Sequence, residues 1–283
     1  MIGFVNVYKR SGDTSTFVVN KIKKIFGVKC GHMGTLDPLA SGVLPVALGQ
    51  ASRAFDHLLD KEKTYIARFD FNYTTASLDL ETPPERYSER VVDREEIEKA
   101  IKGFVGNIEQ VPPAYSAKCV GGTKAYKLAR RGRSVELKPK TVFVKSFKII
   151  DKISDNVYDY EIVCKGGTYI RSLCRDLAYS LGVVGVMTRL ERVSSGVFNR
   201  GNSCSIVDLE KAEDISRFVI PVDSAFDYEK TTLCDEDYKR ILNGLTEGYP
   251  FKDGVYRAYN GDGFIGIMTV TGGKVKITYI RDL

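Results

Sequence analysis

The chain has 283 residues, of which 43% are hydrophobic and 28% charged, and its formal net charge is +6. These values are typical of a globular protein. No run reaches the roughly 18 apolar residues of a membrane span, and the N-terminus has its apolar residues before its charges, the reverse of a signal peptide. The six cysteines are scattered without a CxxC pair, which favours reduced thiols and a cytoplasmic protein over a zinc site or a disulfide framework.

The first part of the chain alternates strand and helix patterns. Residues 2–8 form a short, mostly apolar run that predicts a strand, and residues 14–26 carry an apolar stripe at helical spacing. A loop rich in Gly and Pro follows and ends in an expected strand at 42–48. Residues 65–71 alternate strictly, which predicts a strand with Tyr65 on its apolar face.

The middle of the chain continues this alternation. We expect an acidic helix near 93–104 and a short helix at AYKLARRG, residues 125–132. Residues 141–150 and 157–164 resemble paired strands, and a further strand is expected within 183–198.

One helix has a particularly clear pattern. It is expected over TYIRSLCRDLAYSLG, after a Lys-Gly-Gly turn, and its apolar residues recur at spacings of three and four. Arg171 and Arg175 fall together on the side away from this apolar stripe. The stripe therefore predicts the buried face of the helix.

Past about residue 222 the pattern changes. A short helical piece, DEDYKRILNG, precedes β-rich runs that are joined by Asn-Gly, Asp-Gly and Gly-Gly turns. We therefore expect two domains, a large one at 1–222 and a small β domain at 223–283.

Charge is distributed unevenly along the chain. Residues 118–148 hold ten Lys or Arg and one Glu, whereas residues 79–98 hold eight acidic residues and three Arg. Such asymmetry favours a polyanionic partner on one face, because Lys and Arg replace the counterions of phosphates. On charge alone, a solvated basic surface without a partner is an equally good interpretation.

The stretch with the most unusual composition, GHMGTLDPLASGVLPVALG, surrounds Asp37. His32 and Asp37 are too few for a metal site, no Gly-Lys-Ser/Thr ending indicates a P-loop, and a glycosidase would need a second carboxylate. What remains is an acid in a rigid loop whose glycines allow close approach of a ligand. Pro38 also keeps Asp37 out of helical geometry. Considered alone, an Asp-Pro loop is better explained as a structural turn.

The longer segment GHMGTLDPLASGVLPVALGQASR resembles the signature motif of the TruB family of tRNA pseudouridine synthases. KTYIARFDF, PPAYSAKCVGGTKAYKLARRG, GGTYIRSLCRDL and MTRLERVSSGVF resemble further family segments in family order, so the resemblance covers roughly residues 1–222. It implies an α+β pseudouridine synthase fold, with a mixed, mainly antiparallel central sheet flanked by helices. The remainder is similar to a PUA domain, a small RNA-binding β module.

The resemblance implies an isomerase that converts one uridine in the T loop of tRNA, at position 55, to pseudouridine. The target base is flipped into the site, and neither a metal nor a cofactor is implied. The T stem-loop of tRNA is the implied partner, and we expect the protein to be a monomer.

The resemblance also implies roles for individual residues. Asp37 matches the family's nucleophile, which attacks either the ribose or the uracil, and Arg171 matches the arginine that pairs with it. Tyr65 matches the tyrosine that stacks on the flipped uracil and handles a proton. Tyr169 and Leu190 match residues that line the base pocket.

Two further positions are implied in substrate binding. His32 matches the histidine that occupies the space left by the flipped base. YKRSGDTS resembles the family's Lys-Pro-x-Gly-x-Ser/Thr-Ser segment, in which Lys9 matches the lysine and Arg10 stands where proline is usual.

Two other functions compete with the isomerase. One is an RNA-binding or tRNA-folding protein in which modification is secondary. The other is an unrelated nucleoside-bond hydrolase, although the sequence offers neither a second carboxylate nor a water-activating group for it.

Overall fold

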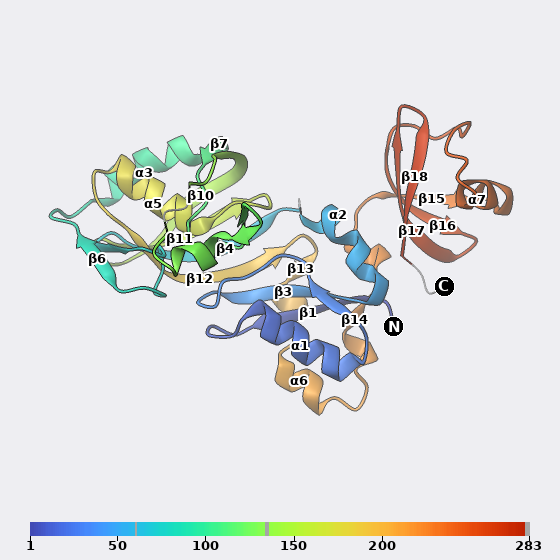
Figure 1. Cartoon of the computed structure of the whole chain (residues 1–283), viewed down its shortest axis with the longest axis horizontal. Coiled ribbons are helices and arrows are strands. Elements are labelled where there is room, and N and C mark those ends of the chain that lie inside the picture. The colour runs from blue at the N-terminus through green and yellow to red at the C-terminus, as the bar shows by residue number, and fades with distance from the viewer. Residues whose placement is uncertain (60, 134–135, 281–283) are drawn as a thin grey trace.

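A ten-stranded sheet forms the centre of the larger part of the molecule (Figure 1). The computed structural model describes residues 1–59, 61–133 and 136–280. The strand order is β14-β1-β3-β12-β4-β11-β10-β7, with β13 beside β12 and β2 beside β3. The strands are β1 (Gly3–Lys9), β2 (Cys30–His32), β3 (Ser41–Leu48), β4 (Lys63–Asp70), β7 (Gly106–Gln110), β10 (Lys140–Ser154), β11 (Val157–Cys164), β12 (Val186–Ser195), β13 (Phe198–Asn199) and β14 (Val219–Ile220).

Most neighbouring strands in this sheet run antiparallel. The pair β3 and β12 runs parallel and brings Ser41 next to Glu191. The predicted mixed, mainly antiparallel sheet is therefore confirmed. The parallel pair also places the loop before β3 beside β12, although the two are far apart in sequence.

Helices flank the sheet in two pairs (Figure 1). The helices α1 (Ser15–Phe26) and α6 (Ile206–Lys211) contact each other beside the β1–β3 half, while α3 (Arg94–Ile101) and α5 (Ile170–Ser180) lie beside the half with β4, β10 and β12. The apolar stripes of α1 and α5 join the apolar face of β4 in one hydrophobic core. Burial of this apolar surface is the main force that holds the helices on the sheet.

A capping residue sets each end of α1. Thr14 caps the helix by accepting a hydrogen bond from the Phe17 amide at 3.0 Å. Gly27 ends it in the left-handed region, with φ of +67°. The predicted helix boundaries are confirmed to within a residue.

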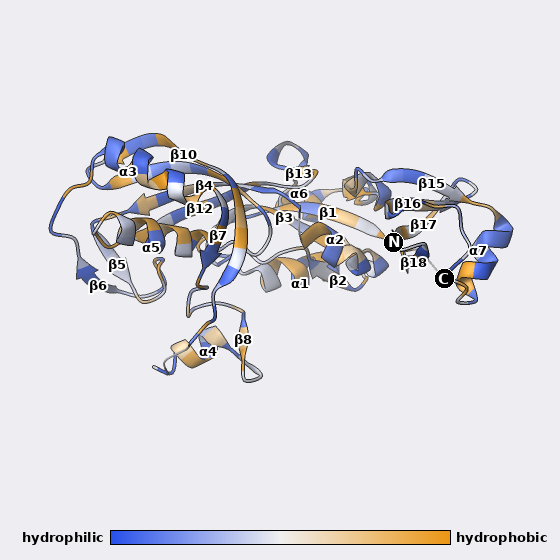
Figure 2. Cartoon of the chain, turned by 90° about the horizontal axis from the view of Figure 1, so that it is seen from above, coloured by the Kyte–Doolittle hydropathy of each residue, from blue (hydrophilic) through white to orange (hydrophobic). Residues whose placement is uncertain are grey.

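Residues 111–133, which we name the arm, project from the body between β7 and β10 (Figure 2). The arm holds the hairpin of β8 (Cys119–Val120) and β9 (Thr123–Lys124), followed by α4 (Ala125–Ala129). The helix was predicted and the hairpin was not. Most side chains of α4 are exposed or half-buried, and Arg130 at its C-terminal end pairs with Glu81 of the body.

A second, four-stranded sheet lies at the C-terminal end, in the order β15-β16-β17-β18. Its strands are β15 (Glu229–Leu233), β16 (Gly254–Asn260), β17 (Gly263–Thr271) and β18 (Lys274–Tyr279). The helix α7 (Asp235–Leu242) packs on it through Tyr238 and Ile241. Gly272 and Gly273 both have positive φ in the turn between β17 and β18, as a tight hairpin requires. The predicted small β unit is confirmed.

The two sheets meet through a shared apolar cluster. Ile267 and Ile280 of the C-terminal part pack with Phe4, Phe198 and Phe226 of the larger part. The predicted boundary at 222/223 lies in this contact region, and the last residues of the predicted second domain, 281–283, lie outside the described residues. In the described ranges, no helix has the length and apolar character needed to cross a membrane.

The remaining elements are short. A hairpin joins β5 (Tyr73–Thr75) to β6 (Pro84–Tyr87), and α2 (Phe55–Leu59) follows the 3-10 turn at Gly49–Ala54. The turn between β5 and β6 matters for the site, because it carries Asp79 toward α5.

Candidate active site

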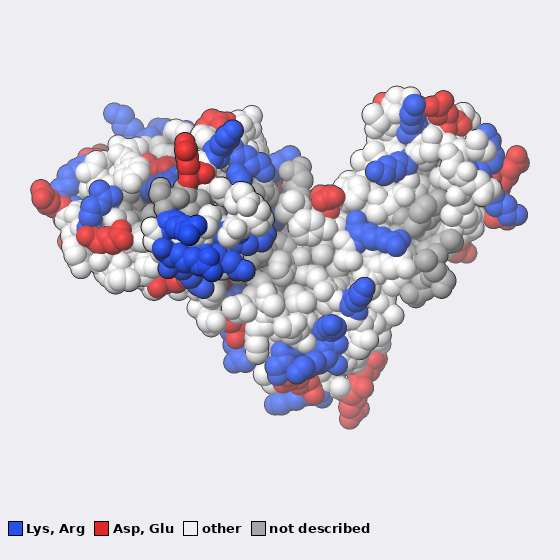
Figure 3. Space-filling model, in the orientation of Figure 1, with Lys and Arg blue, Asp and Glu red and all other residues white. Residues whose placement is uncertain are grey.

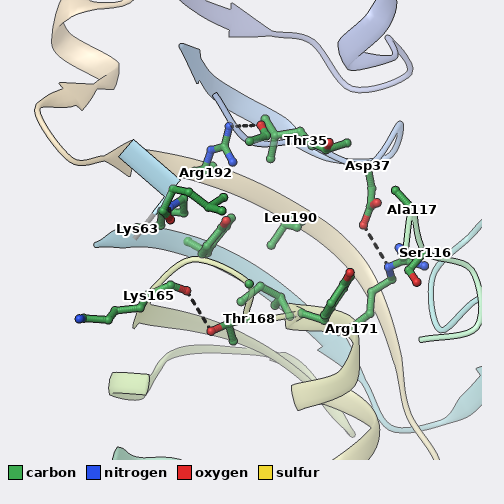
Figure 4. Close-up of a pocket in the computed structure, with 17 residues that line it drawn as sticks. Thr35, Asp37, Lys63, Ser116, Ala117, Lys165, Thr168, Arg171, Leu190 and Arg192 are labelled. Atoms are coloured by element: carbon green, nitrogen blue, oxygen red, sulfur yellow. Dashed lines mark hydrogen bonds and ion pairs between the residues drawn. The ribbon is translucent and has the colours of Figure 1, made fainter. Parts of the chain in front are cut away.

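A cavity of about 230 Å³ opens where the loop before β3, strands β4 and β12, the root of the arm and the start of α5 meet (Figure 4). Five of the seven residues implied by the sequence line it, namely Asp37, Tyr65, Tyr169, Arg171 and Leu190. His32 and Lys9 do not belong to this lining. Segments that are distant in sequence therefore converge on Asp37.

The loop that carries Asp37 is fixed on both sides of this residue. Ser15 Oγ donates to the Leu36 carbonyl at 2.9 Å and accepts from the Leu36 amide at 3.0 Å. On the other side, the Gly12 amide donates to the Pro38 carbonyl at 2.8 Å. The Asp37 side chain is 32% exposed, so its carboxylate is held in place and remains open to the cavity.

Arg171 bridges two carboxylates. Its Nε lies 3.0 Å from Asp37 Oδ2 and its Nη1 lies 3.3 Å from Asp79 Oδ2. The same guanidinium donates to the carbonyls of Ser77 at 2.9 Å and Tyr115 at 3.0 Å. Arg171 is only 4% exposed, so these acceptors satisfy a buried cation and fix its orientation.

As the helical pattern predicts, Arg171 points away from the apolar stripe of α5. The pattern does not show that other segments bury this side of the helix. The β5–β6 turn and the root of the arm enclose Arg171, whereas Arg175 on the next turn stays half-buried.

The pKa of Asp37 reflects competing effects. Burial raises it above its ordinary value, the Arg171 guanidinium lowers it, and the nearby Asp79 charge raises it again. Asp79 is 3% exposed. In the sequence Asp79 is one acid of the stretch at 79–98, and no local pattern separates it from its exposed neighbours.

The opposite wall comes from β4 and β12. The strand register places Arg192 next to Tyr65 and Leu190 next to Ala67. Tyr65 is 8% exposed and Leu190 is 6% exposed. Both line the cavity and give it apolar surface. Burial raises the pKa of the Tyr65 phenol, and the Arg192 charge opposes this effect.

Arg192 is a site residue that the sequence did not identify. It is 1% exposed, with Nε donating to the Val43 carbonyl at 2.8 Å and Nη2 to the Gly34 carbonyl at 3.1 Å. Gly42 has φ of +107°, and a Cβ there would lie 2.3 Å from the Arg192 carbonyl oxygen. This Gly of the motif is therefore needed for close packing of β3 on β12.

Lys9 holds the backbone of the Asp37 loop from behind. Its Nζ donates to the carbonyls of Arg10 at 3.0 Å, Asp13 at 2.6 Å and Pro38 at 3.3 Å. The residue is 1% exposed, and burial lowers its pKa to about 8. The ammonium group is thus engaged by the protein itself.

His32 lies on β2, just before the Asp37 loop. Burial lowers its pKa, and the Arg192 charge lowers it further, which favours the neutral imidazole. Within the described residues its Nδ1 is buried without a hydrogen-bond partner.

Comparison with known protein families bears on this arrangement. Residues 21–170 match the family described as "TruB family pseudouridylate synthase (N terminal domain)", and residues 171–227 match "tRNA pseudouridylate synthase B C-terminal domain". The chain belongs to the TruB family of pseudouridylate synthases. The family predicted from the motif around Asp37 is confirmed, and with it the prediction of an enzyme of the isomerase class.

Relatives match over most of the chain. The tRNA pseudouridine synthase B of Clostridium kluyveri is 38% identical over 276 residues, which are 94% of this chain and 95% of the relative. The tRNA pseudouridine synthase B of Anaplasma marginale is 43% identical over 213 residues, which are 75% of this chain and 70% of the relative.

Solved structures support the fold. The chain superposes with a TM-score of 0.74 on a chain of the crystal structure of a Cbf5-Nop10-Gar1 complex, at 24% identity, covering 99% of this chain and 87% of that one. A chain of an H/ACA RNP bound to a substrate RNA gives a TM-score of 0.73 at 23% identity, covering 99% of this chain and 85% of that one. The pseudouridine synthase fold predicted from the sequence is confirmed.

Proposed function

We propose that this protein converts the uridine at position 55 in the T loop of tRNA to pseudouridine, with Asp37 as the nucleophile. The observation that carries the proposal is the partly exposed Asp37 carboxylate, which faces a cavity and lies 3.0 Å from a buried guanidinium. The reaction is an isomerisation. The N1–C1′ bond breaks, the uracil turns, a C5–C1′ bond forms, C5 loses its proton and N1 gains one.

The nucleophile has to be ionised to react. Burial alone would favour the protonated Asp37, because it raises the pKa of the carboxyl group. Arg171 opposes this effect, because an arginine guanidinium carries a positive charge. The ion pair between them therefore maintains a reactive carboxylate in a largely enclosed site.

The base enters the cavity only after it leaves the RNA stack, which costs a few kcal/mol. Stacking on an aromatic ring returns about 1–3 kcal/mol. Tyr65 and Tyr169 supply rings in the cavity lining, and Leu190 supplies an apolar contact. Because burial raises the pKa of Tyr65, its neutral phenol meets the base at neutral pH.

His32 and Lys9 lie outside the cavity lining, and we assign them other roles. We assign His32, as a neutral imidazole, to contact with the RNA that surrounds the flipped base. We assign Lys9 to positioning of the Asp37 loop rather than to direct substrate contact, because its ammonium group already donates to three backbone carbonyls.

Replacing Lys9 by Met tests its assignment. The carbonyls of Arg10, Asp13 and Pro38 lose the ammonium group as a donor, so we expect the free energy of unfolding to fall by about 1–3 kcal/mol. The loosened loop should lower kcat by about tenfold and leave the Kd for tRNA unchanged. Lys24→Met, at an exposed position on α1, is the matched control. A higher Kd with unchanged kcat would instead assign Lys9 to substrate binding.

A basic surface adjoins the cavity. Figure 3 shows a dense group of Lys and Arg side chains over the arm, and exposed members include Lys124, Lys127, Arg131 and Arg133. The root of the same arm contributes Ser116 and Ala117 to the cavity wall. We therefore assign the arm to the phosphates of the T stem-loop, which would hold the target base close to Asp37.

This assignment predicts strong dependence of tRNA binding on salt. Between about 50 and 200 mM salt we expect the affinity to fall about a hundredfold or more, because released counterions drive the association. The double variant Lys124→Ala, Lys127→Ala should lower the slope of log K against log salt by about one to two. Lys99→Ala, Lys102→Ala, at the end of α3, is the control. A slope that is unchanged in the arm variant would contradict the assignment.

We further propose that residues 223–283 form a PUA-like RNA-binding domain beside a catalytic domain of residues 1–222. The separate four-stranded sheet and its own apolar cluster support this division.

One experiment tests the proposed function against its alternatives. Unmodified tRNA labelled in its uridines is incubated with the wild-type protein, and pseudouridine is mapped, with a U55C transcript and Asp37→Asn as controls. Pseudouridine at position 55 supports the proposal. Binding without product indicates an RNA-folding protein, and release of free uracil indicates a hydrolase.

A further inference from the structure

Gln110, the last residue of β7, makes a reciprocal pair of hydrogen bonds with the backbone of Tyr169. Its Oε1 accepts from the Tyr169 amide at 2.8 Å and its Nε2 donates to the Tyr169 carbonyl at 3.1 Å. Gln110 is 1% exposed. The two residues are 59 positions apart in the chain, so this amide joins two separate elements.

Tyr169 is the N-cap residue, immediately before α5. Its backbone is extended, with φ of −97° and ψ of 111°, and its own side chain makes no capping hydrogen bond. The Gln110 amide therefore supplies polar partners at the start of the helix. Tyr169 lines the cavity, and Arg171 follows in the first turn.

The residues that follow Gln110 hold the same part of α5. Ser172 Oγ and Arg175 Nη2 both donate to the Val111 carbonyl, at 2.9 and 3.0 Å. Arg171 Nη2 donates to the Tyr115 carbonyl at 3.0 Å. The root of the arm is thus attached to the helix that supplies Tyr169 and Arg171.

The side chain of Gln110 is not needed to hold its own strand. The backbone of Gln110 pairs with Lys140 in the ladder between β7 and β10. Both side-chain hydrogen bonds go instead to the start of α5.

We propose that Gln110 is a positioning residue, which fixes the Tyr169 backbone and, through the first turn of α5, the Arg171 guanidinium against Asp37. This inference rests on the proposed function. In this arrangement the end of β7 connects the arm to the Asp37–Arg171 ion pair. Loss of the amide affects the chemical step, because the cations of the arm are untouched.

The substitutions Gln110→Leu and Gln110→Glu test the proposal in steady-state assays on tRNA, with Kd and thermal unfolding measured in parallel. Q110L removes both hydrogen bonds, and we expect kcat to fall about ten- to a hundredfold at every pH, with the Kd for tRNA within about twofold of wild type.

Q110E adds a pH-dependent rescue. A protonated carboxyl group presents a carbonyl and a hydroxyl and can make both hydrogen bonds, whereas the carboxylate can only accept and faces the Tyr169 carbonyl. Burial raises the pKa of such a carboxyl group. The ratio of kcat for Q110E to that of wild type should therefore rise as the pH falls. Asn107→Asp, an exposed amide-to-acid change on the same strand, should show a flat ratio.

Wild-type kcat in Q110L, or a flat ratio in Q110E, would overturn the proposal. A loss of kcat that only follows the loss of folded protein would also overturn it. Wild type and Asp37→Asn in the same assay distinguish failure of this inference from failure of the proposed function. If wild type forms no pseudouridine, or forms no more than Asp37→Asn does, the proposed function itself is rejected.

Discussion

Replacing Asp37 by Asn should abolish pseudouridine formation, with kcat lower by at least about 10⁴-fold, as for the loss of other catalytic nucleophiles. The amide keeps the shape of the side chain but carries no negative charge. The Kd for tRNA should stay close to that of wild type, because the basic side chains of the arm are unchanged. Steady-state assays with mapped pseudouridine and separate binding measurements check both parts.

The same variant should unfold at a higher temperature near neutral pH. Burial raises the pKa of Asp37 in the folded protein, so the folded state binds this proton more tightly than the unfolded state does. Ionisation therefore costs stability as the pH rises through the folded pKa, and the neutral amide avoids this cost. Arg171 keeps Asp79 as a partner.

Asp151→Asn, an exposed change on β10, is the control for both measurements and should alter neither. An Asp37→Asn protein that retains more than about one per cent of wild-type kcat would remove Asp37 from the role of nucleophile. A lower unfolding temperature would show that the carboxylate stabilises the fold instead.

The local pattern of the chain was enough to predict the elements with strong periodicity. The alternation around Tyr65 identified β4, and the three- and four-residue spacing identified α5 with Arg171 on its other side. The apolar stripe over residues 14–26 identified α1. Each of these signals depends on residues within one turn or one strand, which is why sequence alone carries them.

The rest of the site depends on contacts between distant segments. Asp79 contacts Arg171 because the turn that carries it folds back on α5. Arg192 lies beside the Asp37 loop because β12 pairs in parallel with β3. Neither contact leaves a local pattern. The short β7 was missed for the same reason, since its five residues have little periodicity of their own. Lys9 was predicted to bind the substrate, and no side-chain pattern marks the three backbone carbonyls that accept from its ammonium group.

Replacing Arg171 by Met should lower both activity and stability. Asp37 and Asp79 would lose their shared cation, and a buried ion pair that loses one partner costs about 3–5 kcal/mol. We expect kcat to fall by about a hundredfold or more. Because the guanidinium lowers the pKa of Asp37, its loss raises that pKa. The acidic limb of the kcat profile should then move to higher pH.

Arg171→Lys separates charge from geometry. Lysine keeps the positive charge, so the acidic limb should stay close to that of wild type, but one ammonium group cannot span two carboxylates and two carbonyls in the planar arrangement that arginine provides. Arg68→Met is the matched control, because it breaks the Arg68–Asp159 pair outside the cavity and should leave the pH profile unchanged. If the acidic limb of Arg171→Met coincided with that of wild type, Arg171 would not set the charge of Asp37. Its contacts would then serve only to pack α5 against the arm and the β5–β6 turn.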